Sequence, residues 1–253
     1  FAVQIENGSH AMAVQAWEPG ALTRFDSFFL LAIGLYWGIL FVGAGLMFAL
    51  WLLSARAGLM SGGFMALAAL IFEAASFGFG GSSFLAKFGY DPAAVMRPVS
   101  LVFTALAGIV FLRRLFNLRH EMPYLDLALR VFSFALLGAL PLIFTWGFGP
   151  AAARLAAGSA LVASGFAVFL MRRALPESLQ LVPPGWLALA ASGIGALLVS
   201  AFGLGGGSLI VELLVHGAFV TGVLLLVFAG AVRVATPALA SASANIAPAP
   251  MAL

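Results

Sequence analysis

Seven apolar stretches of bilayer-spanning length occupy most of this 253-residue chain, and most of its few charged residues lie between them. A hydrocarbon core about 30 Å thick is crossed by a helix of roughly 20 apolar residues. We therefore predict an all-α membrane protein with a seven-helix transmembrane bundle. The predicted spans are residues 28–53, 64–79, 98–116, 127–148, 151–171, 185–204 and 209–232.

The composition excludes a water-soluble globular protein. Hydrophobic residues make up 63% of the chain and charged residues only 8%, whereas a soluble domain carries about 25% charged residues. Such a sequence cannot cover its surface with groups that water solvates. The short connections between the spans predict one compact membrane domain over residues 26–234.

The two ends of the chain differ from this membrane domain. Two short, partly alternating runs flank the turn-prone Glu6-Asn7-Gly8-Ser9, which predicts a β-hairpin. Because a lone hairpin is at best marginally stable in water, we interpret residues 1–25 as the remnant of a larger periplasmic β domain, with the true N-terminus missing. Residues 235–253 are rich in Ala, Ser and Pro and carry no charge, which predicts a flexible tail.

The distribution of basic residues predicts the orientation. If the N-terminus lies outside, eight of the twelve Lys and Arg residues fall on the inner side and four on the outer side. Inner loops of membrane proteins carry the excess of Lys and Arg, so we expect a periplasmic N-terminus and a cytoplasmic C-terminus. The inner residues are Arg56, Arg113, Arg114, Arg119, Arg130, Arg172, Arg173 and Arg233, and the outer residues are Arg24, Lys87, Arg97 and Arg154.

Several classes of chemistry have no support in the sequence. The net charge of +3 comes from residues at helix ends rather than from a basic patch, so we expect no nucleic-acid partner. The chain has no Cys, which excludes disulfides, thiolate metal sites and Cys nucleophiles. His10, His120 and His216 fall in three different regions, and no Ser/His/Asp arrangement forms on one side of the membrane. We therefore expect no enzymatic activity, no metal and no cofactor.

Three ionisable residues lie inside the predicted spans: Glu73, Glu212 and His216. A charge in the bilayer costs about 2.5 to 3.5 kcal/mol on insertion scales, so each is a functional candidate. Glu212 and His216 are four residues apart and share one helix face. The three could form a buried polar cluster that binds a ligand headgroup or changes protonation during switching. They could equally be interhelical hydrogen bonds that fix packing, and the sequence leaves both interpretations open.

Small residues one helical turn apart predict close helix packing. Gly34 and Gly38 form one such pair, and Ala218 and Gly222 form another. Small residues let helix backbones approach closely. Each pair predicts a packing seam within the chain or a dimer face.

The pattern resembles a known family over nearly the whole chain, namely the bacterial seven-transmembrane receptors with diverse intracellular signalling modules. Residues 1–17 resemble the end of the family's periplasmic sensory domain, and residues 26–53, with Gly34-Leu-Tyr-Trp-Gly38, resemble its first helix. Residues 111–130 are similar to the inner loop between its third and fourth helices, and residues 212–232 to its last helix. The chain departs from the family at Thr221, where a second acidic residue is common, and in lacking a coiled coil and output domain.

The resemblance implies a receptor-like module in the bacterial inner membrane. Its inner-loop relay residues would be Arg113, Arg114, Arg119 and His120. Such a module contacts membrane lipids, passes its signal to another membrane or cytoplasmic protein, and can form homo- or hetero-oligomers. Two alternatives remain open. One is a structural accessory subunit of a respiratory or photosynthetic complex, and the other is a transporter, although no convincing internal repeat supports the latter.

Overall fold

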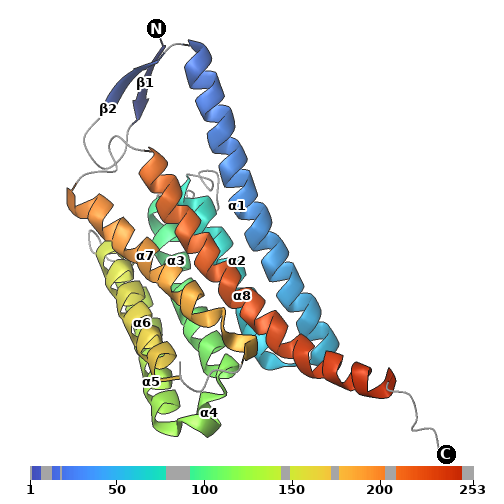
Figure 1. Cartoon of the computed structure of the whole chain (residues 1–253). Helices are drawn as coiled ribbons and strands as arrows, with labels where there is room; N and C mark the ends of the chain where they lie inside the picture. Colours follow the sequence, from blue (N-terminus) through green and yellow to red (C-terminus); the bar gives the residue numbers. More distant parts are fainter. Residues whose placement is uncertain are drawn as a thin grey trace, which may run out of the picture.

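The computed structural model describes residues 2–6, 13–17, 19–77, 92–143, 149–171, 177–202 and 209–246, and within these residues the protein is a helical bundle (Figure 1). A short 3-10 helix, η2 (Glu177–Leu179), precedes α7. The α-helices are α1 (Pro19–Ser54), α2 (Ala57–Ser76), α3 (Pro92–Leu115), α4 (Leu118–Glu121), α5 (Pro123–Ile143), α6 (Gly149–Met171), α7 (Val182–Phe202) and α8 (Leu209–Ile246).

Six helices in the described residues are long and apolar enough to cross a membrane: α1, α2, α3, α6, α7 and α8. This indicates a multi-pass membrane protein. The remaining long helix, α5, carries Asp126 and Arg130 in its first two turns, and the residues that follow Ile143 lie outside the described part. The predicted seventh crossing therefore stays a prediction.

Two short strands precede the helices. β1 (Ala2–Glu6) pairs antiparallel with β2 (Ala13–Trp17), and Gln4 lies opposite Gln15. Residues 7–12 between them lie outside the described residues, and the hairpin stays a prediction.

The bundle has two ends, which we call inner and outer. The inner end carries the link between α1 and α2, the short helix α4 and Arg233 of α8. The outer end is the opposite one. In Figure 1 the start of α1 lies at the outer end, and α8 extends past the inner end to Ile246. α2 packs against α1, α3 and α8, while α3 also contacts α5 and α6, and α7 packs mainly on α8.

The core of the inner half is filled by two large side chains from different helices. Met47 of α1 and Phe111 of α3 are 0% and 1% exposed. Both side chains occupy the space left by Gly62 of α2, and both lie against Gly230 of α8, where an added Cβ would come within 2.8 Å of the Phe111 ring. The four helices meet closely here because two of them carry no side chain at the contact.

Four predicted boundaries differ most from the structure. α1 begins at Pro19 rather than at residue 28, so residues 19–25, which were expected to belong to a β domain, are helical. α2 begins at Ala57 rather than at residue 64, because its glycine-rich first turns are held by packing on α1 and α3, and tertiary packing overrides weak helix propensity. α3 begins at Pro92, which places Pro98 inside the helix. α8 continues to Ile246 where a flexible tail was expected from residue 235, since Ala is the strongest helix former.

Candidate functional site

The centre of the candidate site is a buried contact between α2 and α8. His216 Nδ1 lies 2.9 Å from Glu73 Oε1, within hydrogen-bonding distance. The Glu73 side chain is 0% exposed and that of His216 is 12% exposed. The second carboxylate oxygen of Glu73, Oε2, is buried and has no hydrogen-bond partner among the described residues. Two of the three residues predicted to form a polar cluster thus contact each other directly.

Aromatic rings surround the imidazole of this pair. The Phe77 ring lies 4.8 Å from the His216 ring between centroids, and the Phe72 ring lies at 6.3 Å. Phe77 in turn makes an edge contact with Phe29 of α1, 5.6 Å between centroids. The pair therefore lies in an apolar setting, where an electrostatic interaction is stronger than in water.

A second polar contact ties α8 to α1 near the same level. The Tyr36 hydroxyl donates a hydrogen bond of 3.1 Å to the backbone carbonyl of Leu213. The Tyr36 oxygen also lies close to Gly217, where an added Cβ would come within 2.8 Å of it. The outer part of α8 is therefore tethered to α1 through Tyr36 and to α2 through Glu73.

Glu212, the third predicted member of the cluster, is placed differently. It is partly buried and forms no printed hydrogen bond or ion pair with Glu73 or His216 within the described residues. Instead, Arg97 of α3 interacts electrostatically with both Glu212 and Glu73. The predicted cluster is thus a direct pair with a further acid and a base in its surroundings.

An ion-pair network fixes the inner end. Arg113 Nε of α3 donates to Asp126 Oδ1 at 2.8 Å, and Arg130 Nη2 donates to Asp126 Oδ2 at 3.0 Å. The hydrogen bond from Arg113 is the largest cause of a lowered pKa at Asp126, and Arg130 acts in the same direction against the opposing effect of burial. The Asp126 carboxylate, 8% exposed, therefore locks the start of α5 to the end of α3.

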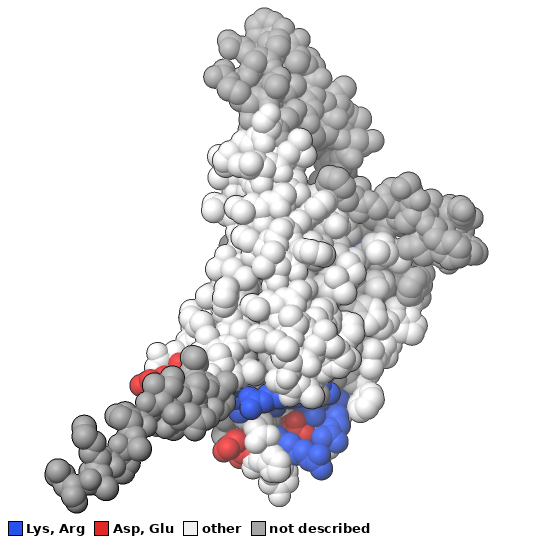
Figure 2. All heavy atoms as spheres, turned by 90° about the vertical axis from the view of Figure 1, so that its right-hand side faces the viewer, with Lys and Arg blue, Asp and Glu red and all other residues white. Residues whose placement is uncertain are grey.

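The other predicted relay residues have different surroundings. Arg119 and His120 are exposed on α4. Arg114 is exposed at the end of α3, where it lines a pocket together with Arg56 and Arg233. Figure 2 shows Lys and Arg side chains gathered near the inner end together with a smaller number of Asp and Glu side chains, whereas the described surface above them is without charge on that face. The four predicted residues thus share one end of the molecule without forming one site.

Sequence reasoning missed two contributors to these contacts. Tyr36 lies within a predicted span, and no spacing rule connects a residue of the first helix to a carbonyl of the last. Asp126 lies at the predicted start of the fourth span, and its position thirteen residues after Arg113 gives no helical period. The position of an acidic residue next to a basic loop is the only sequence signal that could have suggested the contact between Asp126 and Arg113.

The site holds acidic, basic and imidazole groups. Within the described residues no three His, Asp or Glu side chains converge to bind a metal ion. The arrangement can couple the relative positions of α2 and α8 to the contact between Glu73 and His216. No protein-family model, curated protein or solved structure matches this chain.

Proposed function

We propose that this chain is a receptor-like, non-enzymatic membrane module that relays a periplasmic event to a partner at the cytoplasmic side. In this proposal α5 makes the seventh crossing of a bacterial inner membrane, the N-terminus is periplasmic and the C-terminus cytoplasmic. The gathering of basic side chains at the inner end (Figure 2) supports the orientation, because basic residues are retained on the cytoplasmic side.

One observation carries the proposal: a single continuous helix joins the buried pair to the inner end. His216 and Arg233 are both in α8 and are 17 residues apart, which is about 26 Å along a helix. The same helix of 38 residues is about 57 Å long, nearly twice the thickness of a hydrocarbon core of about 30 Å. A displacement at the level of His216 is therefore carried along a rigid element to residues beyond the membrane.

The pair supplies the part of the relay that can change. The contact between Glu73 and His216 crosses from α2 to α8, and Glu73 has one buried oxygen without a partner among the described residues. Transitions in which a helix shifts by 1–2 Å at an interface are a common form of switching, and a switch requires a contact that differs between two states. A ligand or partner that alters this contact would release α8 from α2.

Distance measurements between spin labels test the relay. The chain has no Cys, so Tyr124→Cys on α5 and Ala235→Cys on α8, both at exposed positions, give two unique labels near the inner end. In reconstituted full-length protein we expect Glu73→Gln to shift or broaden the distance distribution between the labels. Glu177→Gln, which alters an exposed carboxylate on η2, is the matched control and should leave the distribution unchanged.

An unchanged distribution in the Glu73 variant would contradict the relay. Purification of the native protein in mild detergent provides a second test. A stoichiometric companion protein together with an immobile α8 would support the alternative function of a structural accessory subunit.

A further inference from the structure

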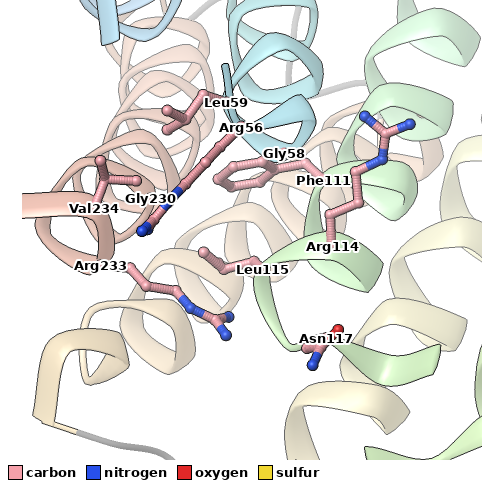
Figure 3. A pocket seen from close by; sticks show the side chains of 10 residues that line it. All are labelled: Arg56, Gly58, Leu59, Phe111, Arg114, Leu115, Asn117, Gly230, Arg233 and Val234. Atoms are coloured by element: carbon pink, nitrogen blue, oxygen red, sulfur yellow. The ribbon is translucent and has the colours of Figure 1, made fainter. Parts of the chain in front are cut away.

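A pocket opens at the inner end, among three regions that are far apart in the sequence: residues 56–59, 111–117 and 230–234. Its volume is about 230 Å³, and its walls come from the link between α1 and α2, the first turn of α2, the end of α3 and the inner part of α8. Figure 3 shows Arg56 extending from the α2 side toward α8 and Arg233 extending from α8, while the guanidinium of Arg114 points away from both. Arg56 and Arg233 therefore line one pocket from two helices.

Neither of these two arginines is neutralised by the described part of the chain. No described acid forms an ion pair with Arg56 or Arg233, and no Asp or Glu is among the described residues that line the pocket. The nitrogen Nη1 of Arg233 is buried without a hydrogen-bond partner there. The charge of Arg56 acts unfavourably on Arg233 and that of Glu121 acts favourably, but Glu121 forms no ion pair with Arg233. A buried donor without a partner is unfavourable, and an anion in the pocket would supply the missing acceptor.

The backbone favours an anion at the same place. Arg56 occupies the N-cap position of α2 in an extended conformation, and its side chain makes no capping hydrogen bond. Gly58, in the first turn, lines the pocket without a side chain. The Leu59 N–H donates to the Arg56 carbonyl at 3.0 Å, whereas the N–H groups before it lack intrahelical partners, and the start of a helix carries partial positive charge. They add to the field of the two arginines.

We infer that this pocket binds a phosphate group, with Arg56 and Arg233 as its charged ligands. Guanidinium groups match phosphate oxygens in charge and geometry, and basic pockets between helices at the cytoplasmic face hold anionic lipid headgroups. The volume lies below the roughly 300–1,000 Å³ of pockets for drug-sized ligands, which suits a headgroup or a free phosphate. This inference does not depend on the proposed relay function.

Binding to the purified full-length chain in a neutral detergent tests the site and distinguishes the two sources of phosphate. The probes are a short-chain phosphatidylglycerol, a short-chain phosphatidylcholine and sodium phosphate, each at constant ionic strength, and the readout is the shift of the thermal unfolding midpoint. We expect phosphatidylglycerol to stabilise the wild type more than phosphatidylcholine does. Stabilisation by sodium phosphate alone to the same plateau would identify free phosphate as the ligand.

Variants locate the binding. Arg56→Gln should weaken the apparent affinity about tenfold or more, because one charged hydrogen-bond donor is lost. Arg56 is exposed, so this variant should fold, and Arg233→Gln should show the same loss. Arg119→Gln is the matched control, since it removes an exposed charge from the same end outside the pocket lining. Equal binding of all probes by the wild type, or an equal loss in the Arg119 variant, would overturn the inference.

Discussion

The buried pair of Glu73 and His216 makes a quantitative prediction about stability. We consider Glu73→Leu, His216→Leu and the double variant, each measured by SDS titration of the purified protein with tryptophan fluorescence as the signal. The first variant leaves a histidine without its partner, and the second leaves a carboxyl group that is 0% exposed with neither oxygen hydrogen-bonded. The double variant replaces the polar pair with apolar side chains.

The expected free energies follow from the burial of each group. Removing one partner of a buried pair costs about 3–5 kcal/mol, so His216→Leu should destabilise by about 3 kcal/mol because Glu73 has no route to solvent. Glu73→Leu should cost about 1–2 kcal/mol. The loss is smaller because the His216 side chain is 12% exposed, whereas that of Glu73 is 0% exposed. The double variant should cost no more than about 2 kcal/mol, because an apolar replacement of a buried pair is often neutral. The coupling between the two sites is then about 2–3 kcal/mol.

This coupling separates a tightly interacting pair from an ordinary interhelical hydrogen bond. Hydrogen bonds between helices in membranes average about 0.6 kcal/mol and reach about 1.7. A control cycle that combines His216→Leu with Glu177→Leu, at an exposed site on η2, should be additive. If the effects of Glu73→Leu and His216→Leu also add within about 0.5 kcal/mol, the two residues do not act as a unit, and our account of the site is refuted.

Two further predictions concern other contacts. Asp126→Asn should destabilise the protein by about 2 kcal/mol at neutral pH, because the Arg113 hydrogen bond to a charged group is lost. The lowered pKa of Asp126 stabilises the protein fully above the unfolded value of about 3.9, so the difference from wild type in unfolding titrations should shrink only as pH falls below about 4; a constant difference would contradict the contact. Gly222→Ala should cost about 1–3 kcal/mol by overpacking, since its Cβ would lie 2.6 Å from Leu189 Cγ. Gly34→Ala, with no heavy atom within 4 Å of the new carbon, should be neutral or slightly stabilising in the same unfolding assay, and equal losses would show that the seam between α7 and α8 has been misplaced.

The two pairs of small residues, Gly34 with Gly38 and Ala218 with Gly222, show how much a sequence pattern can predict. Both Gly34 and Gly222 stand in small-residue patterns that predict close packing. Of these two glycines, only Gly222 lies at a close helix contact within the described chain, where it packs against Gly185 between α7 and α8. Gly34 is open to its surroundings. Small residues one turn apart permit two helices to pack closely. Whether they do so depends on the shape of the neighbouring helix.

The long apolar stretches of the sequence by themselves predicted helices of membrane-spanning length, because about 20 apolar residues cross the hydrocarbon core and a helix satisfies its backbone hydrogen bonds internally. The sequence also singled out Glu73, Glu212 and His216 as buried ionisable residues. It could not say which of them meet, since local spacing connects only residues on one helix. Glu212 and His216 share that spacing, yet the direct contact is between Glu73 and His216, 143 residues apart.

The tertiary structure alone decided the neighbours of each helix. A uniformly apolar helix offers no polar face from which its orientation can be read, so no sequence pattern predicts the pocket between Arg56 and Arg233. The shapes of the side chains determine which helix faces contact each other. The absence of side chains at Gly62 and Gly230 lets Met47 and Phe111 fill the space between α2 and α8. The charge count predicted only that Arg56 and Arg233 lie on the same side, and this packing brings them to one pocket.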